Sequence, residues 1–168
     1  MNRRLLLSLL GVALALAPPA AADRYEDVYE VDSDVHVDIE ILQGRIEIEG
    51  WGKDEVRVRA RGSGADGLDV EVEHDWVSIR AGGRGLGFFL GGEVDLRIDV
   101  PKDSHIQAKT LTGRIKAKDV EGTLSLHTVN GSIDVDGEPE EVFLETVSSS
   151  IDFRGKDSRV DARSMSGS

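Results

Sequence analysis

Hydroxyl and amide side chains recur at a constant interval in the C-terminal half of this sequence. The two sets that follow the interval are Thr110, Thr128 and Thr146, and Thr112, Asn130 and Ser148. A flat stripe of such side chains could bind glycan or peptidoglycan through hydrogen bonds. Ser, Thr and Asn also satisfy backbone groups at turns, and this explains their positions without a ligand. We therefore treat the possible surface polar stripe as a hypothesis beside the turn interpretation.

A second candidate is an apolar segment enclosed by glycines. Residues 82–92 read GGRGLGFFLGG, with Phe88, Phe89 and Leu90 near the centre. An apolar loop tip could contact a partner or a membrane surface, or its two rings could fold back and plug one end of the core. The spacing does not match Gly-x-Gly-x-x-Gly, and no strand–helix unit surrounds it, so we expect no nucleotide. We predict a partner-contact loop and keep the plug as the alternative.

Ionisable residues suggest a metal site only weakly. The carboxylates at 134, 136, 138, 140 and 141 have the oxygen ligands that Ca²⁺ takes, but the EF-hand loop is missing and Asp134 and Asp136 share an outward strand face. The histidines at 36, 74, 105 and 127 do not share a column of the repeat, so we expect no common metal site among them. The sequence contains no Gly-x-Ser-x-Gly or His-Glu-x-x-His motif. We predict no catalytic residue, metal site or cofactor.

The elements that position these residues repeat with the same 18-residue interval from Ser104 onward. Gly113, Gly131 and Gly167 keep this interval, with Ser149 in place of the glycine between the last two. The apolar residues change parity near Thr110, which indicates strands at about 104–109 and 111–118 joined at a corner. A fixed period near 20 residues with short alternating apolar runs is typical of stacked coils of strand. We predict an all-β fold, a single β-solenoid or β-roll of about 18-residue coils.

The repeat also predicts which outward side chains become neighbours in the stack. The expected pairs are Lys116 with Asp134, Asp136 with Arg154, His127 with Glu145 and, as the one repulsive pair, Asp134 with Asp152. Opposite charges directly across a ladder are mildly favourable. Basic and acidic residues thus alternate, which argues against the clustered carboxylates of a polysaccharide-cleaving β-helix enzyme.

The part of the sequence before the regular repeat is predicted to be a less regular β section. Residues 35–48 hold one copy of the repeat pattern, in which Gly44 matches Gly113 and Ile46 matches Ile115. Alternating strands follow near 56–60, 68–72, 77–79 and 94–100 without a fixed interval. They are interpreted either as longer coils or as a small antiparallel section.

Residues 1–22 have the features of a signal peptide: two arginines, an apolar stretch over residues 5–17 and three alanines before Asp23. Cleavage there leaves residues 23–168 as one β-strand-repeat domain, which we expect to be truncated at its C-terminus. Without Arg3 and Arg4, its 18 basic and 32 acidic residues give a charge of −14. Such acidity disfavours nucleic acid and anionic membranes as partners, and without cysteine the domain has no disulfides.

Several segments resemble the bacterial putative-adhesin family. They are GRIEIEGWGKDEVRVRA (44–60), VDLRIDVPKDSHIQAKTLTGRI (94–115) and the TVNGSI and TVSSSI copies, and the resemblance covers about residue 35 to the end. Members are exported β-strand-repeat domains of unknown function, so the resemblance implies a β-solenoid or β-roll in the cell envelope and no established enzymatic activity. The name adhesin rests on the repeat architecture alone, and the family supplies no catalytic residues.

The function predicted from these observations is a non-enzymatic, exported domain of the cell envelope, an adhesin or a surface- and partner-binding scaffold. The expected location is the periplasm, the cell surface or the extracellular space, and the expected partner is an envelope protein or glycan. Two alternatives stay open: a carbohydrate-active β-helix enzyme acting on envelope polysaccharide, and a purely structural spacer.

Overall fold

The computed structural model describes residues 25–81 and 92–166. Its strands are β1 (Tyr25–Glu30), β2 (His36–Trp51), β3 (Glu55–Arg61), β4 (Leu68–Glu73), β5 (Trp76–Ala81), β6 (Val94–Pro101), β7 (His105–Lys118), β8 (Thr123–Asp136), β9 (Glu141–Thr146), β10 (Ile151–Arg154) and β11 (Arg159–Ser164). The one helical element in these ranges is a 3₁₀ turn, η1 (Ala65–Gly67). The all-β prediction is therefore confirmed for the described residues. The predicted leader and the loop with Phe88, Phe89 and Leu90 lie outside them.

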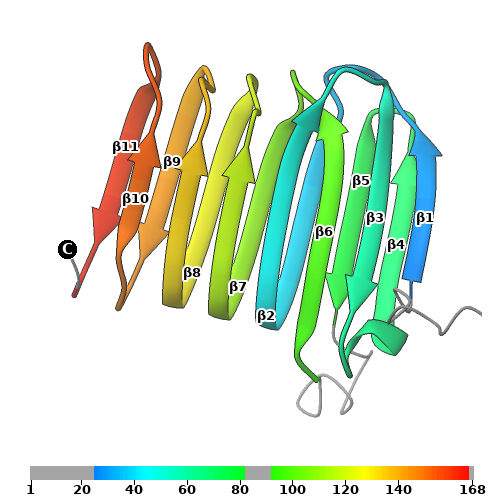
Figure 1. The fold of residues 1–168 in the computed structure, drawn as a ribbon, viewed down its shortest axis with the longest axis horizontal. Coiled ribbons are helices and arrows are strands. Elements are labelled where there is room, and N and C mark those ends of the chain that lie inside the picture. The colour runs from blue at the N-terminus through cyan, green and yellow to red at the C-terminus, as the bar shows by residue number, and fades with distance from the viewer. Residues whose placement is uncertain (1–24, 82–91, 167–168) are drawn as a thin grey trace, which may run out of the picture.

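Three long strands, β2, β7 and β8, form a parallel ladder at the centre of the sheet (Figure 1). Every position of β7 except Leu111 pairs with the equivalent position of the next repeat in β8, so Ile115 lies beside Ile133 and Gly113 beside Gly131. The same step places β9 and β10 on the two halves of β8, and β11 on β9. The register predicted from the constant interval is thus confirmed.

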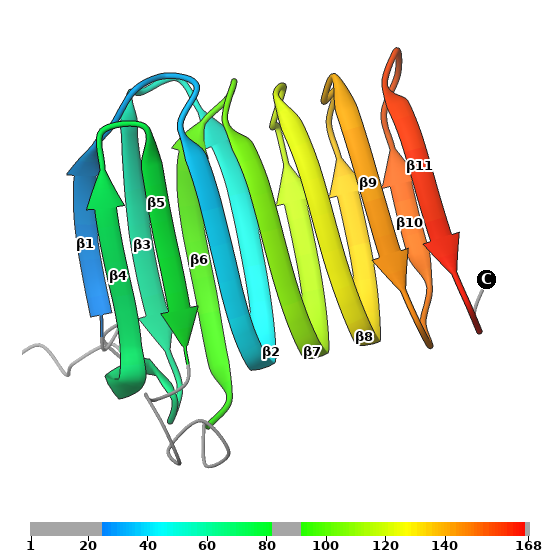
Figure 2. The ribbon, with the colours of Figure 1, turned by 180° about the vertical axis from the view of Figure 1, so that it is seen from behind.

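Each long strand bends midway, and its two halves lie in facing layers joined along one edge (Figures 1 and 2). Glycine is required at this bend because neighbouring backbones approach closely there. A Cβ on Gly113 would lie 1.7 Å from the Gly44 carbonyl oxygen, and one on Gly131 would lie 1.6 Å from that of Gly113. The coil after β8 has Ser149 in this column, and there the strand is interrupted between β9 and β10. The backbone N–H of Gly131 donates to the Ser149 hydroxyl at 2.7 Å.

The core lies between the two layers and is filled by every second side chain of each half-strand. In the first layer Ile106, Leu124 and Val142 stack on one another, each at most 2% exposed. In the second layer Ile115 and Ile133 are fully buried. At about 1.5–3 kcal/mol for each fully buried aliphatic side chain, these columns dominate the stability of the stack.

The N-terminal part adds an antiparallel section to this ladder. β5 pairs in parallel with the first half of β2, and β6 with the second half. β4 is antiparallel to β5, β3 to β6, and β1 to β3. The sheet therefore follows an open path from β1 to β11. Both interpretations of the irregular section hold. The strands β5 and β6 form one wide coil that is parallel to β2, and the strands beyond them are antiparallel. Within residues 25–81 and 92–166, no helix has the length and apolar character needed to cross a membrane.

Candidate functional site

The threonine column of the predicted polar stripe points into the protein. Thr110, Thr128 and Thr146 are 5%, 4% and 0% exposed. The chain bends just after these threonines, so their side chains still face the core. This half of the stripe is not a surface feature, and the expectation of a surface role for it was wrong. The hydroxyls of Thr128 and Thr146 have no hydrogen-bond partner among the described atoms.

The other half of the stripe, Thr112, Asn130 and Ser148, is exposed along the bend. Beside it runs a row of exposed apolar side chains on the same coils: Leu111 at 49%, Val129 at 37% and Val147 at 36%. The strand assigned to 111–118 placed Leu111 on the same face as Ile115, which was wrong because residues 111 and 112 both point outward around the corner. We call these two adjacent rows the bend edge. A shallow depression of about 440 Å³ lies along its polar side.

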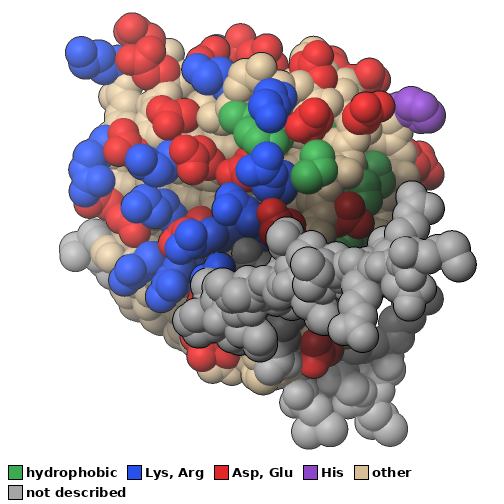
Figure 3. Space-filling model, turned by 45° about the vertical axis from the view of Figure 1, so that its right-hand side comes forward, with side chains coloured by type: hydrophobic (Ala, Val, Ile, Leu, Met, Phe, Trp, Pro, Cys, Tyr) green, Lys and Arg blue, Asp and Glu red, His purple; other side chains and the backbone are tan. Residues whose placement is uncertain are grey.

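A second surface covers the outer face of the second layer, where β3, β6, β2 and β7 lie side by side. The register aligns their outward side chains in three rows. The rows are Arg61, Asp95, Arg45 and Arg114; Arg59, Arg97, Glu47 and Lys116; and Arg57, Asp99, Glu49 and Lys118. All twelve positions are charged, eight of them basic, and we call them the charged grid. Basic side chains gather on this side of the molecule in Figure 3.

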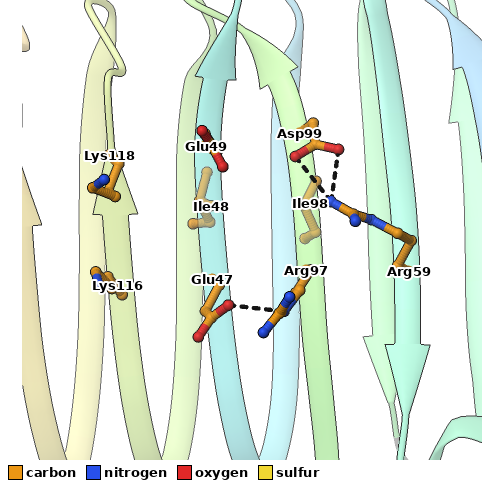
Figure 4. A pocket seen from close by; sticks show the side chains of 9 residues that line it. All are labelled: Glu47, Ile48, Glu49, Arg59, Arg97, Ile98, Asp99, Lys116 and Lys118. Atoms are coloured by element: carbon orange, nitrogen blue, oxygen red, sulfur yellow. Dashed lines mark hydrogen bonds and ion pairs between the residues drawn. The ribbon is translucent and has the colours of Figure 1, made fainter. Parts of the chain in front are cut away.

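The centre of the charged grid is a groove of about 260 Å³. Arg59 donates to both carboxylate oxygens of Asp99 at 2.9 and 3.2 Å, and the Arg97 Nε lies 2.9 Å from a Glu47 oxygen (Figure 4). Lys116 and Lys118 stand on the opposite wall of the groove. Among the described residues these two lysines form no ion pair, whereas the arginines across the groove are held by carboxylates. The register places a carboxylate on each side of both lysines, Glu47 and Asp134 beside Lys116, and Glu49 and Asp136 beside Lys118. The groove is therefore lined by charges of both signs.

Sequence reasoning missed the charged grid because its strands do not share the constant interval of the repeat. The alternating segments RVRAR at 57–61 and RIKAK at 114–118 were the available signals, since each predicts a strand with three basic residues on one face. The neighbours of the first of these faces, β6 and then β2, could not be deduced, because β3 pairs with a strand that is distant in the chain and separated from it by β4 and β5.

A relay of polar side chains lies on the outer face of the first layer. The Ser125 hydroxyl is 3.0 Å from His127 Nε2, and His127 Nδ1 is 3.1 Å from a Glu145 oxygen. The order serine–histidine–carboxylate is that of a nucleophilic triad. The backbone of β8 is held here between β7 and β9, so its N–H groups lie in the sheet plane, engaged in the ladders. They do not form an oxyanion hole above Ser125, and the relay is interpreted as a side-chain ladder pair that confirms the predicted His127–Glu145 neighbours.

The remaining ionisable candidates are placed as follows. His36 and His105 are register partners with ring centroids 4.8 Å apart, so the statement that no histidines share a column was wrong for this pair. The length of chain between register partners in β2 and β7 differs from the interval of the later repeats, so the sequence did not reveal this histidine pair. Asp134 lies 3.9 Å from Arg114, and Asp136 is in register with Lys118. No group of three or more metal-binding side chains occurs in residues 25–81 and 92–166.

Comparisons with known proteins show a fold likeness but no family. No family model matches the sequence, and no curated protein matches it. A crystal structure described as a putative cell adhesion protein from Clostridium sporogenes is similar, with 14% identity, a TM-score of 0.55, and coverage of 77% of this chain and 71% of that one. Another, described as a putative lipid binding protein from Parabacteroides distasonis, has 12% identity, a TM-score of 0.38, and coverage of 82% and 59%. The first likeness shows the fold alone, and the second is too distant to carry an argument.

Proposed function

We propose that this chain is a non-enzymatic binding scaffold of the bacterial cell envelope, built as a β-solenoid of about 18-residue coils. The observation that carries the proposal is the bend edge, where an apolar row and a polar row run side by side at the ladder spacing. The fold likeness to a structure described as a putative cell adhesion protein is consistent with this role. Export through a cleaved leader at residues 1–22, and a location in the periplasm, at the cell surface or outside the cell, are parts of the same proposal.

The bend edge is suited to binding because the ladder fixes the backbone positions of its residues before a partner arrives. Thr112 and Asn130 belong to β7 and β8, are paired in register, and are therefore about 4.8 Å apart. Ordering a partner against such a surface costs less entropy than ordering two mobile surfaces. The paired rows offer apolar contact and hydrogen bonds at one repeat distance, which fits a repetitive envelope glycan such as peptidoglycan. The segment with Phe88, Phe89 and Leu90 stays a predicted second contact outside the described residues.

The test uses the mature chain, isolated peptidoglycan sacculi and a co-sedimentation assay. The double variant Leu111→Ser/Val129→Ser removes two members of the apolar row, and we expect its affinity to fall roughly tenfold, because each truncated contact at the centre of an interface costs about 1 kcal/mol or less. A matched control is Val28→Ser/Val160→Ser, at two valines that are 45% and 41% exposed and do not belong to the bend edge. Sacculi that bind the wild type and both variants equally, or none of them, contradict the proposal.

A further inference from the structure

An exposed phenyl ring lies on the outer face of the first layer. Phe143 belongs to β9, which lies between β8 and β11 at one end of the stack (Figure 2). Its neighbours along the strand, Val142 and Leu144, are buried, whereas Phe143 is 41% exposed. Among the described strands of this layer it is the one large apolar side chain that both points outward and is exposed. A single exposed apolar side chain needs no explanation by itself, so the groups around the ring decide whether it belongs to a site.

Four ionisable side chains surround this ring and pair with one another. Together with Phe143 they line a shallow pocket of about 250 Å³. The His127 Nδ1 lies 3.1 Å from a Glu145 oxygen. The Arg163 guanidinium donates to an Asp161 oxygen at 3.2 Å. The ladder brings these groups together, because Asp161 is the register partner of Phe143. The pocket therefore combines one apolar ring with paired groups of opposite charge.

The charge and size of this pocket favour a small neutral ligand. Its two carboxylates face Arg163 and, when it is protonated, His127, so the net charge of the lining is −1 or 0. An anion would meet both carboxylates, and a cation would meet Arg163. The pocket has one phenyl ring and not the cage of several aromatic rings that binds quaternary ammonium ligands. Its volume is also below the roughly 300 Å³ at which pockets for drug-sized ligands begin.

The free hydrogen-bonding atoms of the pocket favour a ligand with several hydroxyls. Among the described residues, Glu145 Oε1 and Asp161 Oδ1 accept no hydrogen bond, since the pairs above use the other oxygen of each carboxylate. Arg163 has further N–H groups to donate. The backbone of Asp161 is about 4.8 Å from that of Phe143 across the ladder, and that of Glu145 is about 6.6 Å along the strand. Both carboxylates therefore border a ligand that lies on the phenyl ring.

From this geometry we propose that the pocket binds one pyranose ring of a neutral glycan, stacked on Phe143. The face of a pyranose carries C–H bonds, which the negative face of an aromatic ring attracts, and its rim carries hydroxyls. These hydroxyls donate to Glu145 and Asp161, and Arg163 donates to a sugar oxygen. The site does not rest on the function proposed for the bend edge, because the two surfaces share no residue.

Titrations of the mature chain followed by ¹H–¹⁵N NMR test the site. The probes are soluble neutral oligosaccharides of glucose, galactose, mannose and N-acetylglucosamine, with polygalacturonate and tetramethylammonium as the anionic and cationic comparisons. We expect at least one neutral oligosaccharide to shift the amide signals of β8, β9 and β11, with an affinity that changes little with salt because no ion pair forms with the ligand. The proposal is wrong if no neutral oligosaccharide binds, or if either charged ligand binds more tightly.

Two variants at one position separate stacking from simple apolar contact. Phe143→Leu keeps an apolar side chain without the ring and should bind the oligosaccharide roughly 2- to 13-fold more weakly, the range for one lost aromatic contact. Phe143→Trp keeps an aromatic face and should bind at least as tightly as the wild type. The control is Leu111→Ser/Val129→Ser, which changes only the bend edge and should bind as the wild type.

Three outcomes of the variant series would overturn the proposal. The first is a Phe143→Leu protein that binds as tightly as the wild type. The second is equal weakening by Phe143→Leu and by the bend-edge variant, which would assign the sugar to the bend edge. The third is self-association of the wild type in analytical ultracentrifugation that Phe143→Leu abolishes, which would show that a second copy covers the ring. A failure of sacculi to bind the bend edge leaves all three outcomes open to measurement.

Discussion

The glycine column at the bend offers the sharpest test of how this chain stacks. In Gly131→Ala the new methyl carbon would lie 1.6 Å from the Gly113 carbonyl oxygen, 2.6 Å from its carbonyl carbon and 3.0 Å from its nitrogen. The nearest of these distances is about half the closest approach that a carbon atom tolerates. All three atoms are backbone of the neighbouring coil, so no side chain can move aside. The two coils must separate at the bend.

The cost of this separation has two parts. Overpacking in a closely packed region costs about 1–3 kcal/mol. Loss of about two ladder hydrogen bonds at the bend adds about 1–3 kcal/mol. We therefore expect Gly131→Ala to lower the free energy of unfolding by about 2–6 kcal/mol, a large share of the roughly 5–15 kcal/mol typical of a domain. The interruption of the ladder at Ser149, the position with a side chain in this column, agrees with the direction of the effect.

Urea denaturation followed by circular dichroism measures this change. Gly52→Ala is the matched control, because a Cβ at Gly52 would meet no atom within 4 Å. The control should leave the stability within about 0.5 kcal/mol of the wild type or raise it slightly, since alanine restricts the unfolded chain. A Gly131→Ala protein as stable as Gly52→Ala would show that the coils are not stacked backbone against backbone at the bend.

Three further predictions concern single side chains. Asp99→Asn should lower the free energy of unfolding by about 1–3 kcal/mol in urea, because Arg59 would lose the largely buried charge that it contacts at 2.9 Å; an unchanged midpoint would argue against this pair as a stabilising contact. Burial, and next the hydrogen bond with Tyr25, raises the pKa of Tyr29 above its ordinary value, so a Tyr29→Phe difference titration by ultraviolet absorbance should show Tyr29 ionising later than free tyrosine. Because the folded pKa is above the unfolded value of about 10, this stabilisation is present below about pH 10 and is lost as the pH rises further; an ordinary ionisation of Tyr29 would refute it. Ser125 should not react with a fluorophosphonate probe, since the sheet supplies no oxyanion hole above it, and labelling of the intact protein that Ser125→Ala abolishes would favour the enzymatic alternative.

Much of the ladder could be predicted from spacing. Matching side chains that recur at a constant interval become neighbours at every position only if successive coils lie in register. For this reason the predicted neighbours Lys116 and Asp134, and His127 and Glu145, are confirmed, as is the repulsive pair Asp134 and Asp152. Equal spacing is a property of the one-dimensional chain that a parallel ladder preserves in three dimensions.

The corner was predicted with less success. A change of parity shows that the chain turns, but not which residues occupy the turn. The structure bends at 111–113, so Thr110 remains inside and Leu111 is outside. A shift of one residue exchanges the two faces. That shift buried half of the predicted polar stripe and exposed the apolar row that now forms the other part of the bend edge.

The sequence by itself determined the all-β class, the length of each coil and the register of the C-terminal ladder, because side-chain alternation and a constant interval are local properties that stacking preserves. Only the tertiary structure decided which strands flank β2. It places β6 between β2 and β3, although the lengths of chain that separate β6 from these two strands differ and do not match the interval of the repeat. This arrangement assembles eight cations and four carboxylates from four strands into one face. Electrostatic character depends on proximity in space, so a chain with a charge of −12 could hold a positive surface that its composition gave no reason to expect.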